Sequence, residues 1–353
     1  MGSEAKKLRV AVIGVGHLGK EHARVYASMP NVQLVGVVDT DAKQGQAVAS
    51  KHKTQYYASH RELLGAVDAV SVVVPTSHHF AVGKDFLERG IATLVEKPIT
   101  KDVAEAEQLV EIARKAGAIL QVGHIERFNP ALMAVLKKPI RPRFIECHRL
   151  SPFSFRSTDI GVVMDLMIHD IDIILHLVQS DIKRLEAVGV PIMSEYEDIA
   201  NARITFASGC VANVTASRIS LKKLRKIRVF SEDSYISLDY LNREAMIYRK
   251  SPELKIGKAN WKKLAVQAAQ LITSFDGHWF GDLFSIERVK MPDHEPLAKE
   301  LESFVECAAA KTRPIVSGEE GLRALCAAKL ITDEIARGLD ALRKQQTPSN
   351  SES

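Results

Sequence analysis

The sequence has few cysteines and no long apolar run. Only four of its 353 residues are cysteines, and their positions show neither paired nor metal-binding spacing. Free thiols in apolar surroundings are therefore expected, as is usual in the reducing cytoplasm, and no metal site is expected. No apolar stretch approaches the ~18 residues that span a membrane. The segment before the first predicted strand, residues 1–7, is too short and too polar for a signal peptide. We therefore expect no signal peptide, no membrane anchor and a cytoplasmic location.

Aromatic residues make up only 6% of the chain, and the basic residues behind its net charge of +5 are scattered. A nucleic-acid-binding protein usually gathers basic side chains on one surface, so no nucleic-acid partner is expected. The densest basic run is Lys222–Arg228. This run is typical of a solvated edge between strands, and the alternative is contact with a phosphate-bearing partner.

Apolar strands alternate with amphipathic helices over residues 1–123. The strands are largely continuous runs of Val, Ile and Ala, which indicates burial on both faces, as in a parallel sheet. Strand–helix alternation at this spacing predicts a doubly wound α/β domain of the Rossmann type. The predicted strands are Val10–Ile13, Gln33–Asp39, Tyr56–Tyr57, Ala69–Val74, Ala92–Glu96 and Ile119–Val122, and the predicted helices are Gly19–Ser28, Ala42–Lys51, His79–Arg89 and Asp102–Ala116.

The pattern changes after residue 123. Residues 124–338 are predicted to form a second α/β domain with an open, mostly antiparallel sheet. Residues 339–353 are predicted to form a polar tail, which we expect to be disordered over residues 345–353. The predicted helices are Ile125–Lys137, Val162–Val178, Leu297–Lys311 and Glu319–Gly338, and the predicted strands are Ala202–Phe206, Cys210–Ser217, Ile227–Ser231, Tyr235–Asp239 and Ala245–Tyr248.

A Gly-x-Gly-x-x-Gly motif lies between the first strand and the first helix. Gly14 permits a tight turn, Gly16 lets the backbone approach a pyrophosphate, and Gly19 lets helix and strand pack closely. Asp39 ends the second strand, about 20 residues further on, where a carboxylate can accept both ribose hydroxyls of adenosine. It would repel a 2′-phosphate, so the motif predicts NAD rather than NADP. The alternative is a cluster of turn glycines without a ligand.

Further cofactor contacts are expected where later strands end. Pro75 and Thr76 follow the fourth strand at the carboxyl edge of the sheet, where such sheets bind ligands. The alternative for this loop is a simple helix start capped by Ser77. The residues expected at the dinucleotide are Gly14, Gly16, His17, Leu18, Gly19, Asp39, Pro75, Thr76, His79, Glu96 and Lys97.

Glu96-Lys97-Pro98 ends the fifth strand at the same edge of the sheet. Pro98 prevents the strand from continuing. The Lys97 ammonium would project toward the nicotinamide, where it can hydrogen-bond a substrate hydroxyl or the carbonyl formed from it. The alternative is a surface lysine paired with an acid.

Asp165, His169 and Asp172 are spaced to share one face of the predicted helix 162–178. His169 has the ordinary pKa range of a general base. Either aspartate could orient its ring. The alternatives are a core histidine and a metal site, and no further ligand cluster favours the latter.

These three motifs together resemble the glucose-fructose oxidoreductase/inositol dehydrogenase/rhizopine-catabolism (Gfo/Idh/MocA) family over about residues 8–335. The resemblance implies a Rossmann domain, a C-terminal sheet that forms a homodimer or homotetramer, and Lys97, Asp165 and His169 as active-site residues. The glycine-rich start of the family's helix motif is reduced here to Gly161. A non-catalytic dinucleotide sensor is the alternative from another class, and a sensor would not need this trio.

The segments around residues 124–130 and 156–162 resemble the branch of the family that oxidises the 3-hydroxyl of UDP-N-acetylglucosamine. Arg127 and Arg156 suit a diphosphate, as bidentate partners of an anion. The alternatives are structural ion pairs for the arginines, and an inositol or a free sugar as the substrate. The residues expected at the substrate are Arg127, Asn129, Arg156, Ser157 and Asp172.

Overall fold

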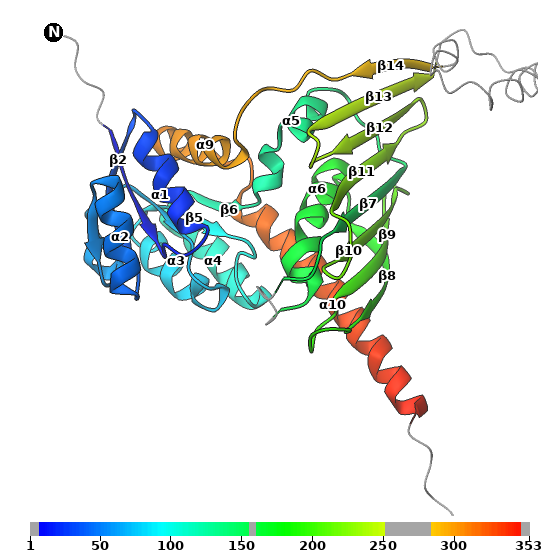
Figure 1. Ribbon diagram of the computed structural model, residues 1–353, viewed down its shortest axis with the longest axis horizontal. Helices are drawn as coiled ribbons and strands as arrows, with labels where there is room; N and C mark the ends of the chain where they lie inside the picture. The colour runs from blue at the N-terminus through cyan, green and yellow to red at the C-terminus, as the bar shows by residue number, and fades with distance from the viewer. Residues whose placement is uncertain (1–6, 155–159, 251–283, 347–353) are drawn as a thin grey trace, which may run out of the picture.

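The computed structural model describes residues 7–154, 160–250 and 284–346. The described chain forms two β-sheets, each covered by helices, with the first at the N-terminal side of the molecule and the second formed largely by residues after 143 (Figure 1). Every predicted strand before residue 123 is present. The predicted combination of a parallel sheet and a mostly antiparallel sheet is confirmed.

Sheet A has six parallel strands in the order β3-β2-β1-β4-β5-β6. This order places the carboxyl ends of β1, β2, β4 and β5 at one edge, where a ligand can bind. The strands are β1 (Leu8–Ile13), β2 (Val32–Val38), β3 (Gln55–Tyr57), β4 (Ala69–Val72), β5 (Ala92–Glu96) and β6 (Leu120–Gly123).

Helices cover both faces of sheet A. One hydrophobic core joins the sheet to α3 (His79–Leu87) and α4 (Val103–Ala116), and α2 (Ala42–His52) follows β2. The core on the other face joins it to α1 (Gly19–Ser28) and α9 (Pro296–Ala310). Leu301 and Phe304 of α9 are fully buried against this face. A helix from late in the chain therefore completes the core of the first sheet.

Sheet B has eight strands in the order β14-β13-β12-β11-β7-β10-β9-β8, antiparallel except for the parallel pair β7–β10. The strands are β7 (Phe144–Leu150), β8 (Ile182–Val190), β9 (Ile199–Phe206), β10 (Val211–Ser217), β11 (Leu224–Phe230), β12 (Ser234–Asp239), β13 (Glu244–Lys250) and β14 (Phe284–Arg288). Our list of predicted strands omitted β7, β8 and β14. Charged and polar residues such as His148 and Arg149 obscure the apolar alternation of β7, although it is a central strand.

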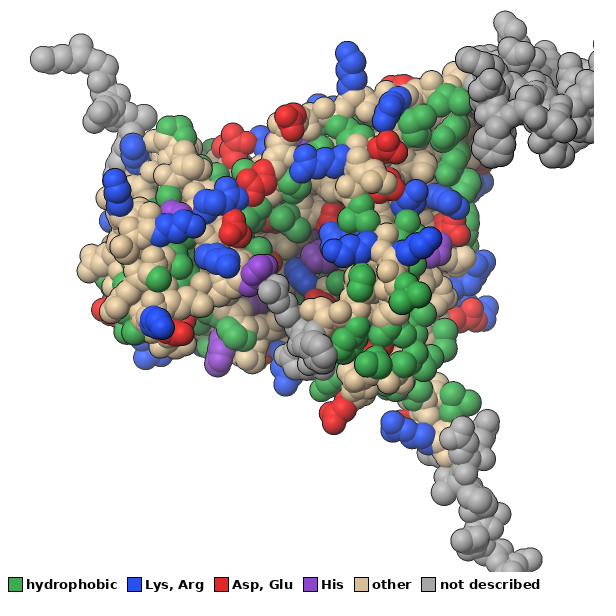
Figure 2. All heavy atoms as spheres, viewed as in Figure 1, with side chains coloured by type: hydrophobic (Ala, Val, Ile, Leu, Met, Phe, Trp, Pro, Cys, Tyr) green, Lys and Arg blue, Asp and Glu red, His purple; other side chains and the backbone are tan. Residues whose placement is uncertain are grey.

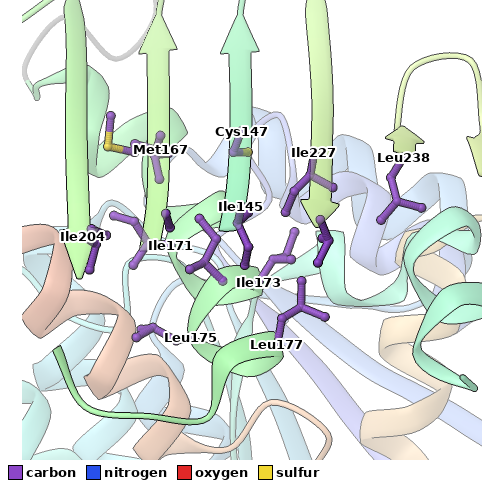
Figure 3. Close-up of a cluster of buried hydrophobic side chains, with 14 of the residues drawn as sticks. Ile145, Cys147, Met167, Ile171, Ile173, Leu175, Leu177, Ile204, Ile227 and Leu238 are labelled. Atoms are coloured by element: carbon purple, nitrogen blue, oxygen red, sulfur yellow. The ribbon is translucent and has the colours of Figure 1, made fainter. Parts of the chain in front are cut away.

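Helices α6 (Ile168–Val178) and α10 (Gly318–Gln346) pack on one face of sheet B. Figure 3 shows Ile171 and Ile173 of α6 among apolar side chains of the strands, including Ile145 and Ile227. These contacts fix the axis and rotation of α6, because a buried interface is close-packed and tolerates little sliding. The start of this helix carries His169.

Two predictions about helix boundaries were wrong. The predicted helix 125–137 is a 3-10 turn, Ile125–Phe128, followed by α5 (Pro130–Leu136), because Asn129 accepts a bond from the Ala131 N–H and Pro130 starts a new helix. The tail predicted from residue 339 is helical as far as Gln346, since α10 continues. Residues 347–353 of that tail lie outside the described residues.

All four cysteines are free thiols, as expected, and three are buried, whereas Cys326 is partly buried. Within the described residues, no helix has the length and apolar character that a membrane span requires.

Candidate active site

The glycine motif forms the turn that we predicted. Gly14 has a φ of +86°, and a Cβ there would lie 2.7 Å from the Val73 carbonyl oxygen. A Cβ on Gly19 would lie 1.9 Å from the Gly14 oxygen, so α1 can approach β1 only without a side chain at this position. Gly16 has no atom within 4 Å of its Cβ position and faces open space. The turn therefore leaves room for a ligand where the motif predicts a pyrophosphate.

Asp39 lies at the same edge of the sheet and stabilises this turn through hydrogen bonds. Its carboxylate accepts hydrogen bonds from the backbone N–H of Val15 at 2.8 Å and of Asp41 at 2.9 Å. Gly14, Gly16, Asp39 and Pro75 line one cavity of about 560 Å³. These residues fit a bound dinucleotide, because the cavity joins a glycine turn to a partly exposed carboxylate.

Not every residue expected at the cofactor faces this cavity. His17 and Leu18 are exposed at the start of α1, and Thr76 lies in the 3-10 turn that Pro75 starts. His79 is buried, and its two ring nitrogens lie 2.9 Å from the carbonyl oxygens of Pro98 and Val74. The His79 ring thus joins two loops of the site, and its contact with the cofactor stays a prediction.

Glu96 also points away from the cavity. Its carboxylate lies 3.3 Å from the ring of buried His22 and accepts a hydrogen bond from the Lys97 N–H at 3.2 Å. A Cβ on Gly123 would lie 2.7 Å from this carboxylate, so the neighbouring strand leaves space for it. Glu96 therefore supports the backbone of Lys97 from the interior, and a direct cofactor contact stays a prediction.

Lys97 joins the two domains. Its ammonium donates to the backbone oxygen of Asp165 at 2.7 Å and to the carboxylate of the same residue at 3.4 Å. The Lys97 side chain is 19% exposed and that of Asp165 is 24% exposed. Both groups thus remain accessible to solvent.

Asp165 and His169 lie at the start of α6, but the helix there is not regular. Residues Val163–Met167 form a π-helical turn, which the sequence did not predict. Such turns often mark functional sites, since they break the regular hydrogen-bond ladder. The carboxylate of Glu197 accepts from the Val163 N–H at 3.2 Å and occupies the space that a side chain on Gly161 would need.

The orientation of His169 differs from our expectation. No hydrogen bond joins it to Asp165 or Asp172 in the described part of the chain. Its Nδ1 is buried without a hydrogen-bond partner, while the residue as a whole is only partly buried. The other ring nitrogen is thus the one available to a bound molecule. The ring of His124 lies edge-on to that of His169, with the ring centroids 6.2 Å apart.

The surroundings of His169 favour its neutral form. Burial, and then the positive charges of Lys97 and Arg149, lower the pKa of His169 well below its ordinary value. A neutral imidazole can accept a proton at neutral pH. The site therefore holds an unprotonated base beside a lysine ammonium.

Three of the residues predicted at the substrate are engaged within the fold. The buried Arg127 guanidinium contacts the Asp172 carboxylate at 2.6 Å and Glu320 at 3.1 Å. Asn129 caps α5 and donates to Glu126. The structural ion pair that we considered for Arg127 is thus present. Its Nη1 has no hydrogen-bond partner among the described residues, and a substrate contact by Arg127 or Asp172 stays a prediction. The predicted Arg156 and Ser157 lie outside the described residues.

Sequence reasoning missed a buried ionic group beside His169. Arg149 of β7 holds Asp170 through two bonds of 2.7 and 2.8 Å, and Glu126 at 2.9 Å. We did not expect it because β7 was not predicted. Among the described residues, no group of His, Cys, Asp and Glu side chains is arranged to hold a metal ion.

A buried carboxyl group on α9 lies behind the site. Glu300 is fully buried, and neither of its carboxyl oxygens has a hydrogen-bond partner among the described residues. Burial, and then the charges of Glu96 and Asp172, raise the pKa of Glu300 well above its ordinary value. Folding therefore favours the protonated form of Glu300.

We expect Glu300→Gln to stabilise the protein increasingly as the pH rises. A raised pKa contributes stability below the ordinary glutamate pKa and loses it as the pH rises toward the folded-state value, by about 1.4 kcal/mol per pH unit. Glutamine is neutral at every pH and avoids this loss. Thermal unfolding from pH 5 to pH 8 measures the difference, with Glu302→Gln on the same helix as the exposed control. An advantage that stays constant with pH would show that Glu300 is charged.

A glycine turn with an acid at the end of the next strand, together with a lysine at the same sheet edge and a neutral histidine, is typical of a nicotinamide-dependent oxidoreductase. Residues 8–124 match the model of an oxidoreductase family with an NAD-binding Rossmann fold, and residues 141–237 match the GFO/IDH/MocA C-terminal domain. The chain belongs to the Gfo/Idh/MocA family of oxidoreductases, and its cofactor is NAD.

The chain is similar to characterised dehydrogenases along nearly its whole length. It is 37% identical over 322 residues to UDP-N-acetylglucosamine 3-dehydrogenase of Acidithiobacillus ferrooxidans, covering 91% of this chain and 95% of that protein. A solved structure of that enzyme superposes with a TM-score of 0.82 at 36% identity, covering 94% and 98% of the two chains. The scyllo-inositol 2-dehydrogenase of Bacillus subtilis is 29% identical over 335 residues, covering 88% of this chain and 89% of that protein.

Proposed function

We propose that this oxidoreductase converts the 3-hydroxyl of UDP-N-acetylglucosamine to a ketone. The observation that carries the choice of substrate is the 37% identity, over 91% of the chain, to an enzyme named for this reaction. The partial exposure of Lys97 and the effect of its charge on His169 support an alcohol oxidation, because they place an ammonium near a neutral base. NAD bound at the glycine turn supplies the acceptor for the hydride.

His169 acts as the general base in this proposal. Its pKa is well below the ordinary value, so it is neutral and can take the hydroxyl proton. Lys97 hydrogen-bonds the same substrate oxygen and stabilises the negative charge that develops there. Asp165 holds the Lys97 ammonium, and we assign it the role of positioning this lysine.

The substrate can be tested by following reduced nicotinamide at fixed NAD while the alcohol is varied. We expect turnover with UDP-N-acetylglucosamine and none with its 3-deoxy analogue, which keeps every other recognised group. Free N-acetylglucosamine, scyllo-inositol and myo-inositol are the comparison alcohols. Turnover of an inositol alone would leave the NAD-dependent oxidoreductase in place and overturn the substrate.

We also propose that sheet B pairs with a second copy of the chain. Among the described residues, helices cover one face of this sheet and none covers the other (Figure 1). On the other face four aromatic rings from adjacent strands stack in a row, with centroid separations of 5.7, 4.8 and 5.1 Å. They are Phe144, Phe230, Tyr235 and Tyr248. Exposure of such an aromatic stripe to water is unfavourable. Its burial against a second copy therefore favours a homodimer or homotetramer.

We expect a dimer or tetramer by light scattering at micromolar concentration. Phe230→Asp places a charge within the stripe and should shift the protein toward monomers. Leu342→Asp, at an exposed leucine of α10, is the control and should leave the mass unchanged. A monomeric wild-type protein would contradict the proposal.

A further inference from the structure

An unassigned arginine lies at the end of sheet B that adjoins the active site. Strand alternation puts Arg225 on the same side of β11 as Ile227 and Val229, which are buried beneath the helices. Its partner across the strand pair is Arg149 on β7. Two arginines therefore lie side by side on the face of the sheet that carries His169 above it.

The two arginines differ in how many close hydrogen bonds their guanidinium groups make within the fold. Arg149 is buried and makes close bonds to Asp170 and Glu126. Arg225 reaches only Glu126, at 3.5 Å, and the oxygen concerned is the one that Arg149 already holds at 2.9 Å. The Arg225 side chain remains 43% exposed. Its guanidinium thus keeps donors free for a ligand.

The pKa of Arg225 is consistent with this incomplete pairing. Burial, and then the charge of Arg149, lower the pKa of Arg225, and the attraction of Glu126 and Asp170 does not offset them. An anion bound here would relieve the repulsion between the two arginines. The charge of Arg225 also contributes to the lowered pKa of His169, which places the guanidinium within electrostatic reach of the catalytic base.

The turn before β11 adds two more cations. Lys222 and Lys223 are exposed, and in the part of the chain that the structure describes neither makes an ion pair. The Ser220 N–H donates to the Ser151 oxygen at 3.0 Å, so the turn lies beside the segment that leaves β7. In Figure 2, lysine and arginine side chains surround the hollow between the two halves of the molecule, where histidine side chains are also visible.

We propose that Arg225, with Lys222 and Lys223 at the rim, binds the diphosphate of a nucleotide-sugar substrate. This inference rests on the proposed function and turns to Arg225 because the buried Arg127 guanidinium already pairs with Asp172 and Glu320. The planar guanidinium can hold phosphate oxygens through two parallel bonds, whereas the lysines add charge without such geometry. In a nucleotide sugar the diphosphate is attached directly to the pyranose, so its anchor must lie near the residue that acts on the ring. Free sugars and inositols lack this group, and Arg225 would therefore discriminate against them.

Arg225→Gln tests the assignment, because glutamine keeps polarity and removes the charged fork. We expect KM for UDP-N-acetylglucosamine to rise about ten- to a hundredfold, the usual loss for a hydrogen bond to a charged group. NAD affinity should not change. Arg143→Gln, at the opposite end of the same sheet and paired with Glu232, is the matched control and should leave KM unchanged. An unchanged KM in Arg225→Gln would overturn the inference.

Two further measurements keep the test decisive. Calorimetric binding of UDP requires no turnover, and it should weaken in Arg225→Gln and as salt is added. If no nucleotide sugar is oxidised but UDP binding depends on Arg225, the anion site stands and the proposed function fails. If UDP-N-acetylglucosamine is oxidised and UDP binds equally to both proteins, only the anion site fails. Should Arg225→Gln not fold, Lys222→Gln/Lys223→Gln alters exposed residues alone, and it should raise KM by a smaller factor. An unchanged KM in that folded double variant would then count against the inference.

Discussion

Replacing His169 or Lys97 by alanine is expected to lower turnover by about 10²–10⁴-fold, which is the usual contribution of a positioned proton-transfer group. Neither side chain lines the cavity at the glycine turn, so NAD affinity should remain nearly intact. Steady-state rates with UDP-N-acetylglucosamine and fluorescence titration with NADH measure the two quantities. His176→Asn, a change further along α6, is the control and should turn over normally.

The pH profile separates a base from a structural histidine. Because the pKa of His169 lies well below its ordinary value, the wild-type rate should not fall from protonation of this ring between pH 8 and pH 6. If His169→Ala kept a near-normal rate from pH 6 to pH 9, the base would be misassigned and Lys97 would become the candidate. A loss in Lys97→Ala that Lys97→Arg restores would indicate that the charge matters more than proton transfer.

Asp39→Ala is expected to weaken the binding of NAD much more than the binding of NADP. The substitution removes an acceptor for the ribose hydroxyls and, with it, the repulsion of a 2′-phosphate. It also removes the bond to the Val15 N–H, so part of the loss comes from the turn and affects both cofactors. Titration of each cofactor against wild-type and variant protein gives the ratio of affinities.

Asp39→Asn isolates the charge in this comparison. Asparagine keeps an oxygen for the Val15 N–H, so the turn should persist while the repulsion disappears. The affinity for NADP should therefore rise relative to the affinity for NAD in this variant. Equal weakening of both cofactors by both substitutions would contradict ribose recognition by Asp39.

The sequence was sufficient to predict features that depend on near neighbours. The glycine turn, the acid at the end of β2 and the lysine at the end of β5 each follow from a short motif between a strand and a helix. Sheet A was predictable for the same reason, because its strands are almost wholly apolar. The irregular start of the helix 162–178 was not, since the π turn at Asp165 leaves no signal in the apolar pattern.

Features that depend on distant partners could not be predicted. Arg127 pairs with Glu320, 193 residues away, and nothing local to Arg127 distinguishes this ion pair from a ligand contact. β7 is recognisable as a strand only through its neighbours β10 and β11 and the carboxylates that neutralise Arg149. The ion pair of Arg127 could not be foreseen because it depends on long-range pairing.

The position of α9 has a consequence for synthesis in the cell. The ribosome completes sheet A at residue 123, but Leu301 and Phe304, which cover one of its faces, emerge far later. Until then this face of the nascent sheet lacks its cover and exposes apolar surface. A ribosome that stops before α9 therefore leaves a product in which one of the hydrophobic cores of sheet A is incomplete.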